Sequence, residues 1–292
     1  MEERLEHHRR RRRSRLLSFS RGQIPARALV PNFFTLLGLC AGLTAIRMAI
    51  DGWYDWAIAA IVFAALLDGV DGRLARLLKA QSRFGAELDS LADFVNFGVA
   101  PAMLVFTWGL GNFRGLGWIA VLAFAIGMGL RLARFNSMLD VEKPKWQSNY
   151  FTGVPAPAGA LVVLLPLYLE RAHLLDMRMA PQLIALYTLA MAFLLVSTIP
   201  TFSGKLAGER IRREYVLPVF MGVGVVVGML LTYPYLTLSG IVAGYLGLIP
   251  VSMRRYRWHE EQDRIAVAER PAEPTILPAI EAGHEAKPET RH

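Results

Sequence analysis

Residues 68–93 read DGVDGRLARLLKAQSRFGAELDSLAD, which places four aspartates, Asp68, Asp71, Asp89 and Asp93, close together in the chain. The run lies inside stretches that are otherwise apolar enough to cross a lipid bilayer. A carboxylate in hydrocarbon is costly, so each aspartate is expected to face a polar cavity. Carboxylates this close repel one another unless a cation lies between them. One or two divalent metal ions are the obvious candidates.

Apolar blocks of helix length recur on both sides of this run. The 292 residues are 54% hydrophobic, yet they carry a net charge of +8. Repeated blocks of about 20 apolar residues are typical of transmembrane helices, whereas a soluble chain would show amphipathic stripes. The blocks lie near residues 29–50, 53–79, 85–110, 116–136, 154–170, 181–199, 215–233 and 235–252. The sequence therefore predicts an all-α, polytopic membrane helical bundle of about eight transmembrane helices.

Lysine and arginine alternate between the two sides of these blocks. An unbroken arginine run, Arg9 to Arg13, precedes the first block. If that end is cytoplasmic, every second loop should also be basic. These loops and the tail do hold such residues: Lys79 and Arg83; Arg131, Arg134, Lys143 and Lys145; Lys205, Arg210, Arg212 and Arg213; Arg254, Arg255 and Arg257. The pattern predicts a multi-pass protein of the inner (cytoplasmic) membrane, with both termini and the aspartates on the cytoplasmic side. Its positive charge would face anionic lipid headgroups and no nucleic acid.

The chain divides into three parts. Residues 1–27 form a basic cytosolic segment, and residues 28–255 form the transmembrane catalytic domain. Residues 256–292 are rich in Glu, Pro, Ala and His without apolar periodicity. Such a composition predicts a disordered cytosolic tail.

Helical geometry explains the spacing of the aspartates. One face of the first helix carries two carboxylates, two small residues and a cation, namely Asp68, Asp71, Gly72, Ala75 and Arg76. One stripe of the next helix carries Gly85, Asp89, Asp93 and Asn96, while Glu87 points away from that stripe. The short link between the helices folds them antiparallel. The two aspartate pairs are therefore expected to meet near the cytoplasmic edge of the membrane.

Each residue type in this run has a chemical reason. Carboxylate oxygens are hard ligands that suit Mg²⁺, Mn²⁺ or Ca²⁺. Small residues let a ligand approach the helix backbone, and Arg76 can bind a phosphate oxygen bidentately. These groups suit substitution at phosphorus, in which metals neutralise charge and a spare carboxylate takes a proton from an incoming hydroxyl. A single buried aspartate would fit an interhelical contact or a proton path equally well, but the combination of positions excludes coincidence.

The run resembles, at every defined position, the signature D-x2-D-G-x2-A-R-x8-G-x3-D-x3-D of the CDP-alcohol phosphatidyltransferases. The resemblance implies transfer of a phosphatidyl or similar group from a CDP-linked donor to an alcohol, with release of CMP. It implies that Asp68, Asp71, Asp89 and Asp93 bind metal and that Asp93 is the general base. It further implies that Gly72, Ala75 and Gly85 line the pocket for cytidine and diphosphate, with Arg76 as its cation. A homodimer is implied as well.

Stretches outside the signature bear on the acceptor alcohol. Five of them resemble the corresponding stretches of integral-membrane phosphatidylserine synthases: residues 31–35, 89–102, 129–136, 151–157 and 197–205. The resemblance covers about residues 28–255. It implies CDP-diacylglycerol and L-serine as substrates and Mg²⁺ or Mn²⁺, as one or two ions, as the cofactor. Asn96 departs from the pattern, since most relatives would have serine there.

Two arginines and two asparagines are candidates for binding serine: Arg131, Arg134, Asn96 and Asn136. The arginines would hold the carboxylate, although both also fit the positive-inside bias. The asparagines would receive the ammonium or hydroxyl, although interhelical hydrogen bonds explain them equally well. Asn32 and Thr35 are candidates for binding CDP-diacylglycerol beside its nucleotide. Alternatively, Pro31 and Asn32 simply start the first helix.

Two other functions stay open at this point. A sister enzyme would use glycerol 3-phosphate, an inositol compound or choline as acceptor. A phosphorylated acceptor needs an additional basic cluster, and Arg131 and Arg134 keep that option open. An ion-coupled transporter could use the aspartates as its cation site, but the signature spacing and the absence of an obvious repeat oppose it.

Overall fold

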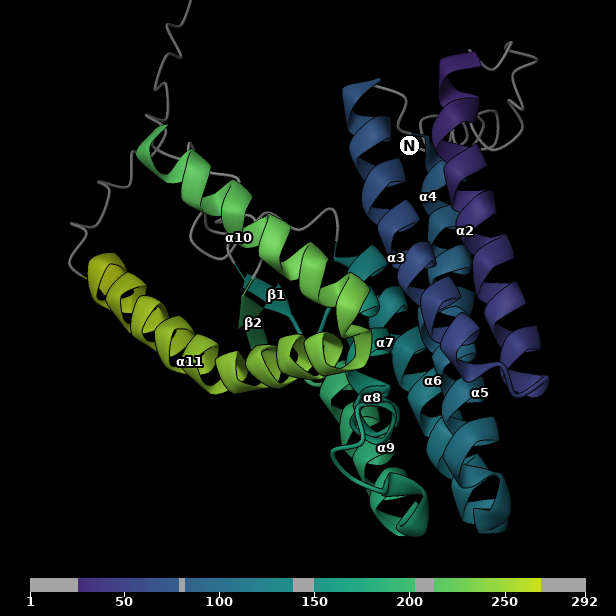
Figure 1. Cartoon of the computed structure of the whole chain (residues 1–292). Coiled ribbons are helices and arrows are strands. Elements are labelled where there is room, and N and C mark those ends of the chain that lie inside the picture. The colour runs from purple at the N-terminus through teal and green to yellow at the C-terminus, as the bar shows by residue number, and fades with distance from the viewer. Residues whose placement is uncertain (1–25, 79–81, 139–149, 203–212, 269–292) are drawn as a thin grey trace, which may run out of the picture.

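The computed structural model describes residues 26–78, 82–138, 150–202 and 213–268 (Figure 1). These residues are almost entirely helical, with one short two-stranded ribbon, so the predicted all-α class is confirmed. Most of the two predicted tails lies outside the described residues. So do six of the basic loop residues: Lys79, Lys143, Lys145, Lys205, Arg210 and Arg212.

The first four predicted blocks each form a helical rod. The elements are α2 (Ala26–Ile50), α3 (Tyr54–Leu77), α4 (Arg83–Asp93), η1 (Phe94–Val99), α5 (Ala100–Val105), η2 (Phe106–Leu110), η3 (Gly111–Phe113) and α6 (Arg114–Ser137). Residues 83–113 form one continuous rod in which η1 and η2 are π-helical turns. α2 begins before Pro31 and contains it, so the alternative in which Pro31 starts the first helix is wrong.

The second half of the described chain is less regular. Its elements are β1 (Tyr150–Thr152), α7 (Ala156–Val163), α8 (Leu165–Arg171), η5 (Met177–Met179), α9 (Pro181–Val196), β2 (Pro200–Phe202), α10 (Arg213–Thr232) and α11 (Pro234–Ala268). α11 continues well past the predicted end of the domain, so residues 256–268 are helical where the sequence predicted a tail.

Five helices in the described part of the chain are long and apolar enough to cross a membrane. They are Leu29–Ile50, Arg83–Phe113, Gly115–Ser137, Tyr215–Thr232 and Pro234–Asp263. The other predicted blocks fall short for physical reasons: α3 carries aspartates and arginines, α7 and α8 are separated by a break, and α9 has 16 residues. The chain is therefore a multi-pass membrane protein, and the number of eight spans stays a prediction.

Small residues allow the closest helix contact in the bundle, that between α2 and α3. Ala45 and Ala49 on α2 and Ala57 and Ala64 on α3 are fully buried. Small side chains let two backbones approach, which is the main source of helix association in lipid. This contact positions the α3 aspartates against α2.

α10 contrasts with the bundle, because its side chains from Tyr215 to Thr232 are exposed apart from the half-buried Leu230. Figure 1 shows α10 and α11 spreading away from α2–α6 as two arms that meet near α7. Exposed apolar side chains on a membrane helix face lipid tails, so this exposure needs no protein partner.

The ribbon joins two of the stretches outside the signature, those around Gly153 and Pro200. α7 begins just after Pro155, and α9 ends at Val196. β1 and β2 pair antiparallel, with Phe151 opposite Thr201. Gly153 follows β1 with a φ of +81°, a conformation that glycine adopts readily. The ribbon therefore ties the start of α7 to the end of α9.

Candidate functional site

Three of the four aspartates meet, two from α3 and one from α4. Carboxylate oxygens of Asp68, Asp71 and Asp89 all lie within 4.8 Å of one another. Asp71 is buried, while Asp68 and Asp89 are half-buried. Asp93 stands next to this group, with its carboxyl within hydrogen-bond reach of that of Asp68. Glu87 is exposed, as its position on α4 predicts.

α2 supplies a neutral donor to the cluster through Thr35. The buried Thr35 hydroxyl donates to Asp71 Oδ2 over 2.9 Å, and the Pro31 carbonyl oxygen lies 3.2 Å from the same hydroxyl. A hydroxyl donor fixes the direction of a carboxylate without neutralising it. Thr35, predicted to border the nucleotide, therefore lies directly against Asp71 and orients it.

The small residues of the signature have different surroundings. A Cβ built on Gly72 would meet nothing within 4 Å, so the α3 backbone is open there. The exposed Arg76 donates from Nε to the Gly72 carbonyl oxygen over 3.0 Å, which leaves its terminal amino groups without a partner among the described residues. Ala75 lies half-buried beside them. Open backbone and free guanidinium donors are what a phosphate group requires.

The space beside Gly85 is filled by other protein atoms, unlike the open space beside Gly72. A Cβ on Gly85 would stand 2.9 Å from Asn32 Oδ1 and 3.1 Å from Ser82 Oγ. Ser82 caps α4, because its Oγ accepts from the Gly85 backbone N–H over 3.0 Å. The close approach that Gly85 permits in this structure is therefore that of Asn32 from α2, and Asn32 stands at the edge of the site.

The π-helical turn η1 separates Asn96 from the aspartates. A π turn holds more residues than an α turn, so Asn96 leaves the stripe that Asp89 and Asp93 share. Asn96 is 3% exposed and packs on α2, where a Cβ on Gly42 would overlap its amide. Its Oδ1 has no hydrogen-bond partner among the described residues. Asn96 therefore lies at a helix contact but makes no interhelical hydrogen bond among the described residues, and its contact with serine stays a prediction.

Arg131 lies beside the cluster with part of its guanidinium unused. Its Nε donates to the Val154 carbonyl oxygen over 2.6 Å. The guanidinium is near enough to Asp93 and Asp68 to interact with both electrostatically. No hydrogen bond or ion pair of its terminal amino groups occurs among the described residues, so these groups are free to bind an anion.

Arg134 is instead committed to the end of α9. Nη1 donates to the Val196 carbonyl oxygen over 2.6 Å, and Nη2 donates to Ser197 over 3.0 Å and to Leu195 over 3.4 Å. A cation commonly satisfies the last carbonyl groups of a helix in this way. Two arginines that the sequence treated alike therefore have different surroundings.

Asn136 makes an interhelical hydrogen bond. Its Nδ2 donates to Ser90 Oγ over 2.8 Å and so connects α6 to α4 between Asp89 and Asp93. Sequence reasoning did not single out Ser90 or Ser82. The preference of serine for N-caps would have found Ser82, whereas Ser90 carries no comparable local signal.

The donor set fits a hard divalent metal ion. The three clustered groups are all carboxylates, and oxygen-only sites suit Mg²⁺, Mn²⁺ or Ca²⁺ better than softer metals. Like charges gathered this closely in a half-buried setting call for a cation. Fold and site together define a polytopic membrane protein with an acidic cluster that could hold a metal ion.

Comparison with known proteins makes this class specific. The family described as CDP-alcohol phosphatidyltransferase matches residues 28–202, and a second one, described as CDP-alcohol phosphatidyltransferase 2, matches residues 214–250. The chain belongs to the CDP-alcohol phosphatidyltransferase family, as its signature predicted.

Curated relatives carry a more specific name. The chain is 38% identical to the CDP-diacylglycerol–serine O-phosphatidyltransferase of Mycobacterium leprae (strain TN) over 231 residues, which cover 79% of this chain and 76% of the relative. It is 37% identical to the enzyme of that name from Mycobacterium tuberculosis (strain H37Rv), with 79% and 80% covered. The Bacillus subtilis (strain 168) enzyme of that name is 34% identical, with 58% and 88% covered.

Proposed function

We propose that this protein transfers the phosphatidyl group of CDP-diacylglycerol to the hydroxyl of L-serine and releases CMP. The observation that carries the proposal is the meeting of the Asp68, Asp71 and Asp89 carboxylates beside the open backbone at Gly72. The names of the curated relatives support serine as the acceptor.

Asp68, Asp71 and Asp89 hold the metal, with Asp93 as a further ligand, and the ion is Mg²⁺ or Mn²⁺. The site holds one ion or two; two divalent ions would balance the four carboxylates, and one would balance half of their charge. When bound, the metal neutralises charge on the phosphoryl oxygens and on the departing CMP. Thr35 keeps one Asp71 oxygen turned toward α2 through its hydrogen bond, so the other is left for the site.

Asp93 is the general base. It takes the proton from the serine hydroxyl, whose oxygen then bonds to the phosphorus that carries diacylglycerol, while the bond from that phosphorus to the CMP oxygen breaks. The Asp68 carboxyl beside Asp93 and the Ser90 bridge to Asn136 limit how α4 and this base can move.

The nucleotide end of the donor lies along α3. Gly72 leaves the backbone open to the diphosphate, and the terminal amino groups of Arg76 bind its oxygens. Ala75 keeps that face narrow. Asn32 borders the same region from α2, against Gly85.

Arg131 binds the serine carboxylate. Of the two arginine candidates it is the one with free terminal amino groups, and it lies beside the proposed base. Arg134 supports the site indirectly by holding the end of α9. A phosphorylated acceptor would need a second free cation here, so this arrangement favours serine over glycerol 3-phosphate or an inositol phosphate.

The proposal includes the setting of the enzyme. CDP-diacylglycerol enters laterally from the cytoplasmic leaflet of the inner membrane, and serine arrives from the cytosol, with both chain termini on that side. The enzyme works as a homodimer, as the family resemblance implies. The alternating basic residues of the sequence support this orientation.

An acceptor screen tests the proposal. Purified protein in detergent receives CDP-diacylglycerol, Mn²⁺ and isotope-labelled serine, and mass spectrometry reads the lipid products. Phosphatidylserine and CMP in equal amounts are expected. Product with glycerol 3-phosphate, an inositol compound or choline, and none with serine, would overturn the acceptor. Release of CMP in detergent, where no transport can occur, separates a transferase from a transporter.

A further inference from the structure

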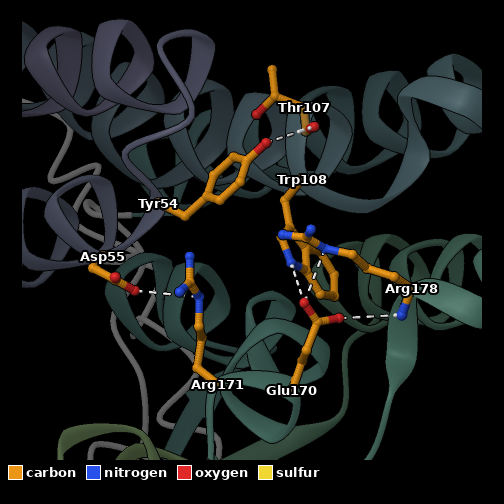
Figure 2. A network of polar contacts seen from close by, with 7 residues as sticks. All are labelled: Tyr54, Asp55, Thr107, Trp108, Glu170, Arg171 and Arg178. Carbon is orange, nitrogen blue, oxygen red and sulfur yellow. Dashed lines mark hydrogen bonds and ion pairs between the residues drawn. The ribbon is translucent and has the colours of Figure 1, made fainter.

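A second polar site lies at the end of the bundle opposite the aspartates. Tyr54 and Asp55 begin α3, and about 24 Å of helix separates Asp55 from Asp71 at 1.5 Å per residue. Figure 2 shows these residues facing side chains from η2, from α8 and from η5. The Tyr54 hydroxyl donates to the Thr107 carbonyl oxygen over 3.2 Å, which fixes the ring in place.

Glu170 is fully paired within this site. Its Oε1 accepts from Arg178 Nε over 2.9 Å and from Trp108 Nε1 over 3.2 Å. Its Oε2 accepts from the Arg178 backbone N–H over 3.2 Å. This carboxylate therefore has little capacity left for a ligand.

Asp55 is paired through one of its two oxygens. Its Oδ1 accepts from the Tyr235 hydroxyl over 2.6 Å, and Arg171 Nε lies 3.3 Å from the same oxygen. Tyr235 belongs to α11 and Arg171 to α8, so this pairing joins three helices. Both Glu170 and Asp55 therefore have partners from the protein itself.

The two guanidinium groups keep unused donors. Arg178 donates from Nε to Glu170, whereas Arg171 Nε forms an ion pair with Asp55 without making a hydrogen bond. The terminal amino groups of both arginines have no acceptor among the described residues. Both groups lie over the Tyr54 ring, at 6.0 and 5.6 Å from its centroid. Two nearby guanidinium forks with free donors form a site for a tetrahedral oxyanion such as phosphate.

A cavity of about 860 Å³ opens in front of these donors. Its walls include both arginines, Tyr54 and Tyr235, and also Asp176, an exposed carboxylate without a partner among the described residues. Leu174 and Leu175 line it as well and are more than half exposed. The cavity has the size of a small-molecule site and offers donors, one free carboxylate and an apolar rim.

We propose that this cavity binds the headgroup of a zwitterionic phospholipid from the leaflet at this end of the helices. The phosphate would lie on the free amino groups of Arg171 and Arg178, the ammonium near Asp176, and the first acyl carbons on Leu174 and Leu175. The three carboxylates Asp55, Glu170 and Asp176 outnumber the two arginines by one formal charge. A headgroup without net charge therefore fits better than an anionic one.

Native mass spectrometry of the full-length protein in detergent, titrated with phosphatidylethanolamine, tests the proposal. The test variant carries Arg171→Lys and Arg178→Lys, which keep both charges but remove the planar forks. We expect this variant to hold phosphatidylethanolamine about tenfold more weakly than the unaltered protein. Arg47→Lys is the matched control, because Arg47 is an exposed arginine that pairs with Asp51 outside the cavity, and it should bind like the unaltered protein.

Two further arms identify the ligand. Inorganic phosphate should not displace the lipid at equal concentration, and phosphatidylglycerol, which lacks an ammonium group, should bind more weakly. Displacement by phosphate would overturn the assignment of a lipid headgroup and would indicate that the cavity binds a free anion. Equal binding by the double variant, or equal binding of the two lipids, would overturn the proposed contacts.

A second variant covers the case in which the double variant does not fold. Asp176→Asn alters an exposed side chain and keeps both arginines in their ion pairs. It should reduce the preference for phosphatidylethanolamine over phosphatidylglycerol, with CMP release unchanged. An unaltered preference would contradict the role of Asp176.

Discussion

The two ends of the helix bundle both gather charged side chains, but the balance between donors and acceptors differs. At one end, Asp68, Asp71 and Asp89 stand together and the bonded donor among them is the Thr35 hydroxyl. At the other end, Asp55 and Glu170 are each paired with an arginine, and the surplus lies in the guanidinium N–H groups. The groups of a polar cluster that lack a partner, whether donors or acceptors, therefore indicate the charge of its ligand. The aspartate end calls for a cation, and the opposite end calls for an oxyanion.

Removal of a carboxylate from the aspartate cluster should have the largest effect on activity. Asp89→Asn takes one carboxylate from the cluster and should reduce phosphatidylserine formation to the level of a protein-free control, because the metal provides several kcal/mol of charge stabilisation. A chelator should do the same, and Mn²⁺ or Mg²⁺ should restore activity to the unaltered protein alone. Labelled-serine incorporation measures both. Glu87→Gln on the exposed face of α4 is the control, and comparable loss in that variant would contradict a local metal role.

Asp93→Asn should come next. An amide cannot accept the proton from serine, so we expect kcat to fall by about 10²–10⁴-fold. Metal binding should persist because Asp68, Asp71 and Asp89 remain. The rise in thermal midpoint on addition of Mn²⁺ measures this binding. Near-normal turnover in this variant would remove Asp93 as the base.

Substitutions of the two arginines of α6 should have different effects, one on substrate binding and the other on stability. Arg131→Gln should raise the KM for serine by about tenfold or more, because a charge-assisted hydrogen bond to the substrate carboxylate is lost. The KM for CDP-diacylglycerol should change little. Steady-state kinetics with each substrate varied in turn provide the measurement, and an unchanged KM for serine would show that Arg131 does not bind it.

Arg134→Gln should act on stability instead. It removes donors from carbonyl groups at Leu195, Val196 and Ser197, and we expect a loss of about 1.5–3 kcal/mol in unfolding free energy. The thermal midpoint in detergent reports this loss. The KM for serine in the folded fraction should match that of the unaltered protein, and a selective rise would place Arg134 at the substrate.

The paired end should show the smallest effect on catalysis. Glu170→Gln weakens the contacts to Arg178 and Trp108 and should lower stability by about 1–3 kcal/mol, while kcat at low temperature stays unchanged. Melting curves and CMP release, measured on one preparation, test both statements. A large fall in kcat without a lower melting midpoint would contradict the separation of the two ends.

The features that could be predicted from the sequence, the helices and the aspartate cluster, depend on local patterns of apolar and acidic residues. The apolar blocks became helices because their length and composition leave few alternatives in lipid. Spacing in steps of three and four placed Asp68 and Asp71 on one face of α3 and Asp89 toward them from α4.

What the sequence could not provide depends on distant partners. Arg131 and Arg134 look equivalent in the chain, and only contacts to Val154 and to the end of α9 distinguish them. The pairing of Asp55 with Tyr235 joins residues far apart in sequence. The position of Asn96 failed to follow an α-helical stripe, because the π turn that displaces it has no simple sequence signal.

The π turn η1 also has a consequence for how the sequence of this rod can change in evolution. The turn contains one residue more than an α-helical turn would need to join residues 83–93 to residues 100–105. Deleting one residue within Phe94–Val99 would return the segment to α-helical geometry and keep the faces on its two sides in nearly the same relative orientation. Sequence alignments across this segment should therefore allow a one-residue gap. Designers who wish to exchange the second half of the rod can graft it after Val99 without disturbing the metal end.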